Sequence, residues 1–134
     1  MELRRTRLHV IISTVLTQKN NNIMADANRR EYTVIVERDQ KFKDHTASGW
    51  YVRETWMQGD RISRAIGPAV TIRHPVTHIA VLEEYRDEQG RLHNLLGPAV
   101  TYRNAHSGEI ESEKYFEYGV ERGPPELDPE PTGL

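Results

Sequence analysis

Apolar and polar residues alternate in two stretches of the first half of the chain. In residues 32–37 every second side chain is tyrosine or valine, and in residues 50–56 Trp50, Val52, Glu54 and Trp56 fall on the same parity. A period of two, rich in β-branched and aromatic residues, is typical of β-strands. The polar residues 39–48 between the two stretches predict a loop, and no segment of this region carries the 3.6-residue apolar stripe of a helix. We therefore expect a mainly β protein.

The second half contains a tandem repeat. The sequence Gly-Pro-Ala-Val-Thr occurs at residues 67–71 and again thirty residues later at 97–101. Other residues match at the same offset: Arg61 and Arg91, Ile62 and Leu92, Ile66 and Leu96, Arg73 and Arg103, and Tyr85 and Tyr115. Such a match at one offset indicates an internal duplication. Tyr115 belongs to a third, truncated copy.

Each copy is expected to turn at its glycine-proline pair, Gly67-Pro68 or Gly97-Pro98. Proline fixes its own φ angle and pushes the preceding residue out of the helical region, while glycine alone enters positive φ without steric cost. We therefore expect positive φ at both glycines. On this basis Gly97→Val destabilises the fold more than any charge reversal in the acidic strand at residues 109–117.

Two further turns divide each copy into strands. Residues 87–90 predict a hairpin turn between strands at 81–86 and 91–93, and residues 104–108 predict a turn that leads to a strand at 110–118. After the glycine-proline turns, Val70 and Val100 start short strands in which Thr71 and Thr101 point to the opposite face. Each copy is thus a pair of short antiparallel strands, stacked on the next.

Residues 55–124 resemble the MORN-like repeats of bacterial and phage proteins, which run roughly from a tyrosine through a glycine turn and Leu-His to Gly-Pro-Ala. Tyr85, Gly90, the Arg-Leu-His of residues 91–93 and the Gly-Pro-Ala of 97–99 fit this pattern. The first copy has Ile-Ser at residues 62–63 in place of Leu-His, and the third lacks both Leu-His and the alanine. The resemblance implies tandem antiparallel β-hairpins in an elongated, twisted sheet, and it implies no activity.

The segments outside the repeat suggest three divisions of the chain. Residues 1–30 form an N-terminal extension in which arginines precede a mostly apolar run at 8–17. This extension is either signal-like or lies upstream of a natural start at Met24. Residues 31–122 form the β-hairpin repeat domain. Residues 123–134 hold four prolines and three acids, and we expect a disordered tail.

Composition excludes several classes of function. The 134 residues include no cysteine, which rules out disulfides, thiolate zinc sites and a cysteine nucleophile. No apolar run reaches the roughly 20 residues of a membrane helix, and no nucleotide-binding or nucleophile motif is present, so we expect no cofactor and no membrane association. The formal net charge of −2 gives no general attraction to nucleic acid. A cytoplasmic location is expected, with secretion as the alternative if the N-terminal segment is a signal.

Catalysis and metal binding are not expected. His74 and His78 flank a proline and suit a polar turn better than a metal site, because extended backbone holds them roughly 13 Å apart. His93, at the Leu-His position of the repeat, suits a hydrogen bond in a turn. Residues 109–117 carry glutamates on one parity and predict an acidic, solvated sheet face. A flat repeat sheet offers no obvious cleft in which two carboxylates would flank a substrate.

Binding is the function that the remaining residues favour. Trp, Tyr and Arg are typical anchors of protein interfaces, and the candidates are Trp50, Trp56, Arg73, Tyr85, Tyr102 and Arg103. The leading hypothesis is a non-enzymatic module that binds a protein partner, with a homodimer through sheet edges as a corollary. One version is a phage- or mobile-element-encoded inhibitor of a host complex. The alternative is nucleic-acid binding along a Thr71/Arg73 and Thr101/Arg103 ladder, unless cross-strand glutamates neutralise it.

Overall fold

The computed structural model describes residues 5–12, 29–43 and 49–125. Strands make up 56% of these residues. No helix occurs in the described ranges, so none there is long and apolar enough to cross a membrane. The end of the predicted 8–17 run, Met24 and the acidic part of the predicted tail beyond residue 125 lie outside the described residues.

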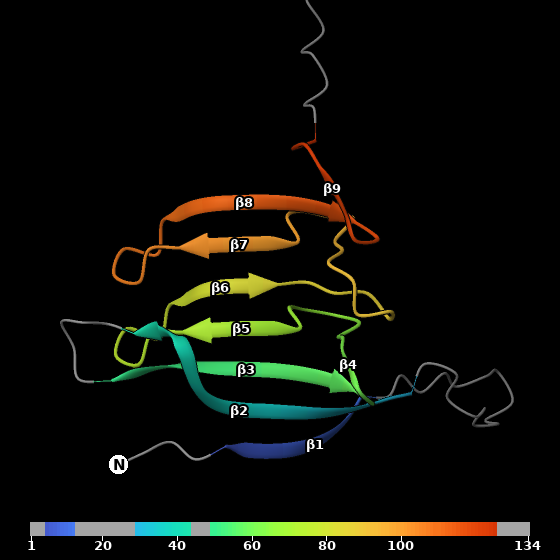
Figure 1. Ribbon diagram of the computed structural model, residues 1–134, viewed down its shortest axis with the longest axis horizontal. Coiled ribbons are helices and arrows are strands. Elements are labelled where there is room, and N and C mark those ends of the chain that lie inside the picture. Colours follow the sequence, from blue (N-terminus) through green and yellow to red (C-terminus); the bar gives the residue numbers. More distant parts are fainter. Residues whose placement is uncertain (1–4, 13–28, 44–48, 126–134) are drawn as a thin grey trace, which may run out of the picture.

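Nine antiparallel strands form one open sheet that does not close into a barrel (Figure 1). The order across the sheet is β1-β2-β3-β5-β6-β7-β8-β9, and the short β4 pairs with β3. The strands are β1 (Thr6–Ile12), β2 (Arg30–Lys43), β3 (Trp50–Gln58), β4 (Arg61–Ile62), β5 (Val70–Arg73), β6 (Ala80–Glu84), β7 (Val100–Arg103), β8 (Ile110–Glu117) and β9 (Val120–Arg122). The mainly β, antiparallel fold with successive hairpins is therefore confirmed.

The N-terminal strands extend the sheet beyond the repeat. β1 pairs with β2 along its whole length, from Thr6 opposite Val36 to Ile12 opposite Arg30. The sheet thus includes residues that the sequence analysis assigned to an N-terminal extension. β2 also continues to Lys43, so the first five residues of the loop predicted at 39–48 are strand. Burial explains part of this difference, because Asp39 is only 2% exposed and lies 3.8 Å from Arg53.

Equivalent backbone hydrogen bonds follow the glycine-proline pair in the two full copies of the repeat. Ala69 donates its backbone N–H to the Glu84 carbonyl, and Ala99 donates to the Lys114 carbonyl one repeat later. The predicted turn at 87–90 joins arms that pair at Arg86 and Leu92. The truncated third copy is the β8–β9 hairpin, whose two-residue turn at 118–119 has positive φ at both positions. These observations confirm the hairpin turns predicted from the sequence.

The turns at the other end of the sheet also repeat. In the first copy the buried Nδ1 of His74 accepts the backbone N–H groups of Val76 and Thr77, both at 3.1 Å. In the second copy Oδ1 of Asn104 accepts the equivalent pair from residues 106 and 107, at 2.9 and 3.0 Å. His74 therefore stabilises a turn, as its proline neighbour indicated. Asn104, thirty residues later, makes the equivalent hydrogen bonds with a smaller side chain.

The core is divided between the two faces of the sheet. Val34 pairs opposite Trp56, and both join Tyr32 in a buried cluster on one face. Val70 pairs opposite Thr55, the neighbour of Trp56, and so points to the other face. There it packs with Ile72, Leu82 and other residues in the larger cluster. Ile62 and Leu92 of the short arms and Phe116 of β8 pack against that cluster. The repeated apolar position 62/92 thus helps to cover the sheet.

Candidate functional site

The loops that carry the glycine-proline turns meet at one end of the sheet and enclose a hollow of about 520 Å³. We call it the loop groove. Its walls come from three loop segments and two residues of the neighbouring strands: Arg30, Gln58, Ser63, Arg64, Ala65, Gly67, Tyr85, Arg86, Asp87, Glu88, His93, Asn94, Leu95 and Leu96. The expectation that a flat repeat sheet offers no cleft is therefore wrong, because the loops project from the end of the sheet and create one.

A second, smaller hollow of about 180 Å³ lies one repeat further along. Its lining includes residues 94–97 and 115–117, which stand thirty residues after residues 64–67 and 85–87 of the loop groove. The third copy ends early, so β9 and Pro125 take the place of a next glycine-proline loop on the far side. The hollows are thus a product of the repeat, and the larger one forms where two full copies adjoin.

Two lining residues of the loop groove, Arg64 and Gly67, are in close contact, and Arg64 also stacks on the buried Trp56 behind them. The Arg64 guanidinium carbon lies 3.7 Å from the centre of the Trp56 ring, within the range of a cation–π contact. Its Nη1 donates to the Pro68 carbonyl at 3.3 Å. A Cβ added to Gly67 would meet the guanidinium at 3.0 Å, and Gly67 has a φ of +100°. Glycine is therefore required here for two independent reasons.

The second copy builds the same loop with a smaller residue. Asn94 replaces Arg64, donates from Nδ2 to the Pro98 carbonyl and accepts the Leu96 N–H on Oδ1, both at 3.0 Å. Gly97 is not among the residues with positive φ, and its nearest neighbour to an added Cβ is 3.7 Å away. The expectation of positive φ at Gly97 is therefore wrong. The amide of Asn94 holds the loop closed without a group stacked on the glycine, so the same five-residue sequence takes a different backbone.

Two large apolar residues that line the loop groove are exposed: Leu95 is 62% exposed and Leu96 98%. Ile66, which is 80% exposed, holds the position of Leu96 in the first copy, next to the glycine of the turn and between the lining residues Ala65 and Gly67. Exposed large apolar side chains beside a hollow are typical of binding surfaces. None of these three was among the site residues predicted from the sequence, where the available signal was an apolar pair inside a predicted turn.

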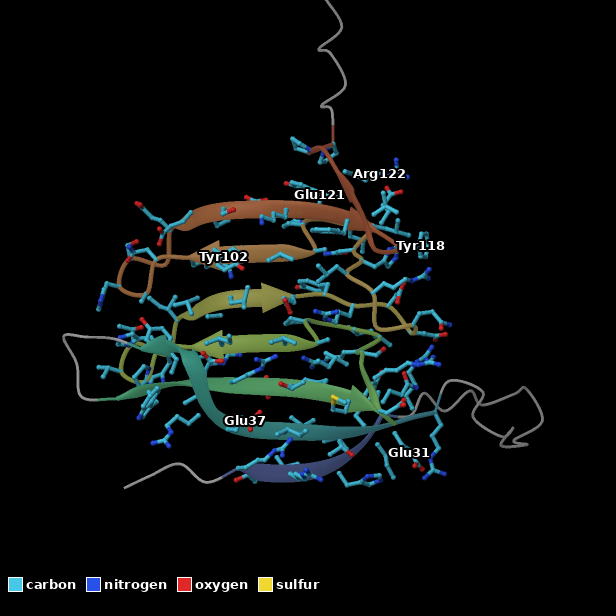
Figure 2. The ribbon with its side chains drawn as sticks, in the orientation of Figure 1. Glu31, Glu37, Tyr102, Tyr118, Glu121 and Arg122 are labelled. Carbon is cyan, nitrogen blue, oxygen red and sulfur yellow. The ribbon has the colours of Figure 1, made fainter. Side chains whose placement is uncertain are left out.

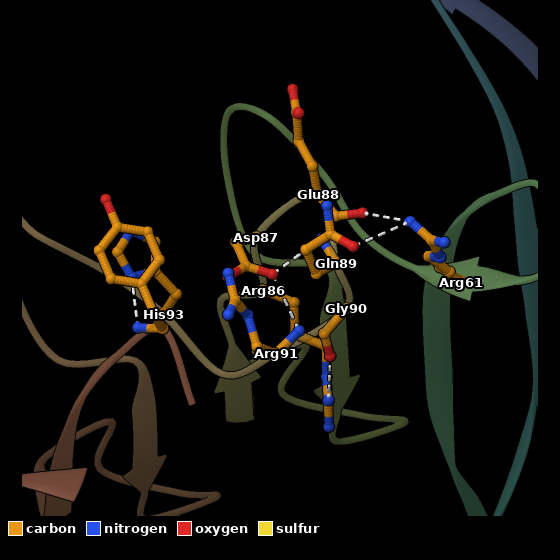
Figure 3. Close-up of polar contacts among 9 residues, drawn as sticks. Arg61, Arg86, Asp87, Glu88, Gln89, Gly90, Arg91 and His93 are labelled. Carbon is orange, nitrogen blue, oxygen red and sulfur yellow. Dashed lines mark hydrogen bonds and ion pairs between the residues drawn. The ribbon is translucent and has the colours of Figure 1, made fainter. Parts of the chain in front are cut away.

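One wall of the groove is a capped turn centred on Asp87 (Figure 3). Its Oδ1 accepts the N–H groups of Gln89 and Arg91 at 2.9 and 3.0 Å, and its Oδ2 lies 2.9 Å from Arg91 Nε. Burial raises the pKa of Asp87, but these bonds from Arg91 and Gln89 together outweigh it, so the pKa lies below its ordinary value. Arg61 closes the turn by donating to the Glu88 carbonyl and the Gln89 side chain.

The ionisable groups of the groove are engaged in structural contacts. Glu88 pairs with Arg30 at 2.7 Å, and Asp87 caps its turn. His93 accepts the Tyr118 N–H on Nδ1 at 2.9 Å and stacks on its ring at 4.1 Å, which bears out the turn hydrogen bond expected of it (Figure 3). Within the described ranges, no three His, Asp or Glu side chains gather as metal ligands would.

The aromatic candidates named from the sequence are spread over the molecule. Trp56 is 9% exposed and belongs to the buried cluster of the N-terminal strands, where it meets Tyr32 edge to face. Tyr85 lines the loop groove. Tyr102 lies on β7 and packs against the larger core cluster (Figure 2). Trp50 begins β3 under the Arg38 guanidinium, 4.8 Å from its ring centre. The fold therefore brings Tyr85 and the Trp56–Arg64 stack together and leaves the others apart.

The two ladder positions predicted from the repeat do share a face. Glu83 stands opposite Thr71 on one side and Thr101 on the other. The full row reads Glu54, Thr71, Glu83, Thr101 and Glu113 across β3, β5, β6, β7 and β8. Arg103 forms an ion pair with Glu83, whereas Arg73 is exposed and has no ion pair within the described residues. The ladder is thus interleaved with carboxylates, and one of its arginines is neutralised.

The acidic strand keeps its charges in solvent. Glu111, Glu113 and Glu117 of β8 are all exposed, as the alternation of residues 109–117 predicted. The Tyr115 hydroxyl donates to Glu113 at 2.8 Å, and this bond raises the pKa of Tyr115 above its ordinary value. These glutamates lie along the strand and do not face the main hollow.

Comparisons with known proteins found no match to this chain. The chain matches no protein-family model, no curated protein and no solved structure. The similarity to MORN-like repeats therefore stays a prediction carried by the residues alone, and any functional conclusion rests on the geometry of the loop groove and the sheet edges.

Proposed function

We propose that the chain is a non-enzymatic protein-binding module that receives its partner at the loop groove. The observation that carries the proposal is the exposure of Leu95 and Leu96 in the lining of a hollow of about 520 Å³, with the exposed Ile66 adjacent to two other lining residues in the sequence. Interfaces gain most of their affinity from a few side chains that become fully buried. Burying one leucine contributes roughly 1.5–3 kcal/mol.

Electrostatics favours a partner that presents a carboxylate beside an apolar side chain. Arg30 and Arg86 of the groove are already paired, with Glu88 and Glu84 respectively. Arg64 has no carboxylate partner in the described part of the chain, and its guanidinium is held in place by Trp56 and the Pro68 carbonyl. An arginine fixed in this way loses little conformational entropy when it binds an acid. An acidic peptide segment with a leucine-sized anchor therefore fits the groove.

The row of glutamates gives nucleic acid less support as the partner. Glu54, Glu83 and Glu113 alternate with the threonines of the ladder. Phosphate binding needs unpaired cations along a stripe, and here Arg103 is neutralised by Glu83. An inhibitor of a host complex, encoded by a phage or a mobile element, is the narrower form of the protein-binding proposal, and it rests on the repeat resemblance alone.

The test is affinity purification from the source organism with variants that change only an exposed apolar side chain of the groove or the fixed cation. Leu96→Asp alters a side chain that is 98% exposed, so the fold is expected to survive. Arg64→Gln removes the cation. Ile110→Asp is the matched control, because Ile110 is also exposed, at 53%, but belongs to β8 and lines neither hollow.

The proposal expects at least one protein whose recovery falls by about tenfold or more with Leu96→Asp, in line with the loss of one buried leucine. The same protein is reduced with Arg64→Gln and retained with Ile110→Asp. Thermal melts of all three variants accompany the purification. Recovery that is equal for the groove and control variants, or no recovered partner at all, would show that the groove is not a docking site.

A further inference from the structure

The two edges of the sheet differ in a way that points to self-association. β9 has three residues, and Glu121 and Arg122 project from it (Figure 2). Gly123, Pro124 and Pro125 follow directly, and proline has no N–H to offer a further strand. Short length, charges and prolines are the usual protections of an edge strand. β9 covers only Tyr115–Glu117 of β8, and the remaining outer side of β8 carries the exposed charges of Glu111, Glu113 and Lys114. Charges and prolines therefore protect this edge against pairing with a neighbouring chain.

β1 at the opposite edge carries one charged residue, Arg7, and has neither of the other two protections. It is seven residues long, contains no proline and pairs with β2 without a bulge. The sheet order ends at β1, so no described strand covers its other side. Leu8, Ile11 and Ile12 are 51%, 47% and 40% exposed. A long, regular and apolar edge of this kind is a template for another strand.

We propose that β1 pairs antiparallel with β1 of a second copy, about a two-fold axis at His9. This register uses all seven residues of β1 and so makes the most backbone hydrogen bonds. It sets Leu8 opposite the second copy's Val10, and Arg7 opposite its Ile11. The charges and prolines along the β8–β9 edge oppose further pairing there, so assembly is expected to stop at a dimer.

The side chains support this register on the apolar face. Trp56 lies opposite Val34, and Val34 lies opposite Leu8. Leu8 would then meet the second copy's Val10, which pairs with Tyr32 of its own chain. The row of apolar side chains thereby continues from one copy into the other without a break. Because directly opposite apolar pairs are the unit of sheet stabilisation, the pairing extends a core cluster that already exists.

The opposite face of β1 allows the register to be tested with charged substitutions. Ile11 lies opposite Glu31 within its own chain and would lie opposite Arg7 of the second copy. Ile11→Lys is therefore expected to stabilise the monomer and to weaken the dimer, whereas Ile11→Glu does the reverse. Each substitution acts twice in a two-fold dimer, and cross-strand pairs contribute roughly 0.2–1 kcal/mol each, so the dissociation constants of the two variants should differ by about tenfold.

The first experiment is sedimentation velocity of the full chain over the micromolar range, with thermal melts in parallel. The wild type is expected to shift from monomer to dimer with concentration, with Ile11→Glu dimerising more tightly than Ile11→Lys. A wild type that stays monomeric throughout overturns the proposal. So does a dimer whose dissociation constant is the same in both Ile11 variants.

The second experiment determines the register by disulfide cross-linking. The chain has no native cysteine, so the introduced thiols have no competitors. His9→Cys places the two thiols opposite one another at the axis, where they are expected to form a disulfide-linked dimer on oxidation. Arg7→Cys is the matched control on the same exposed face, because its two copies would stand roughly 13 Å apart. Equal cross-linking of the two variants, or none with His9→Cys, overturns the proposed pairing.

Discussion

The contrast between Gly67 and Gly97 makes the sharpest prediction about stability, because one sequence motif carries two different backbones. Alanine at residue 67 would have to adopt a φ of +100° and place its Cβ 3.0 Å from the Arg64 guanidinium. A Cβ added at residue 97 has its nearest neighbour, Nδ2 of Asn94, 3.7 Å away, and the φ angle of Gly97 is outside the positive range. We therefore expect Gly67→Ala to destabilise the fold and Gly97→Ala to leave it nearly unchanged.

The magnitude follows from three contributions. A non-glycine residue at such a φ angle costs about 1–3 kcal/mol. Moving Arg64 away adds the loss of its contact with Trp56, about 0.5–1 kcal/mol, and of its bond to the Pro68 carbonyl, about 1 kcal/mol. The free energy of unfolding should thus fall by roughly 2.5–5 kcal/mol for Gly67→Ala. For Gly97→Ala the free energy of unfolding should change by less than about 0.5 kcal/mol. Alanine lowers the conformational entropy of the unfolded chain, and this gain offsets any small shift of the loop needed to fit the added methyl group.

Urea denaturation followed by circular dichroism measures both values, and the melting temperature gives a second readout of roughly 4 °C per kcal/mol. The Arg64→Ala background separates the contributions. There the displacement of Arg64 no longer contributes, so Gly67→Ala should cost about 1.5–2 kcal/mol less than it does in the wild type. Equal costs at residues 67 and 97 would refute the reasoning, and an unchanged cost in the Arg64→Ala background would refute the role of the guanidinium.

Three further outcomes are expected. Tyr32→Phe removes the hydroxyl that accepts the Ala65 N–H at 3.0 Å; it should cost about 1 kcal/mol and speed amide exchange in residues 64–66 but not in 94–96. The lowered pKa of Asp87 means that its carboxylate stabilises the fold at neutral pH, so the urea midpoint of the wild type should exceed that of Asp87→Asn at about pH 7. This difference should shrink as the pH falls below 3.8, the ordinary pKa of an aspartate, because the carboxylate becomes protonated. Asn94→Ala loses both loop bonds and should cost about 1–2 kcal/mol in a thermal melt, with Asn94→Asp between it and the wild type.

Local patterns were sufficient for much of the fold. The alternation in residues 32–37 and 50–56 predicted β2 and β3, because a strand places successive side chains on opposite faces whatever it pairs with. The turns at 87–90 and 104–108 were predicted from residue types that bond to their own backbone, and Asp87 and Asn104 do so. The thirty-residue offset predicted equivalent copies, since the same residues repeat the same local bonds.

The candidate site was less accessible to sequence reasoning. Anchor residue types favoured the six aromatic and arginine candidates, but only Tyr85 lines the loop groove. Trp56 contributes through its contact with Arg64. The exposed Leu96 was recognised as the repeat partner of Ile66 and not as part of a surface. Exposure depends on whether another segment covers a side chain, and no periodicity in the loop encodes that.

By itself the sequence determined the strand pattern, the turns and the repeat, because each depends on residues close together along the chain. Only the tertiary structure decided which loops enclose a hollow, which edge of the sheet is open and which glycine takes positive φ. These depend on contacts between distant segments: Arg64 over Trp56, Tyr32 against residue 65, and β1 against β2. Asn94 in place of Arg64 is one substitution in the repeat, yet its effect on Gly97 appears only when the loop is packed.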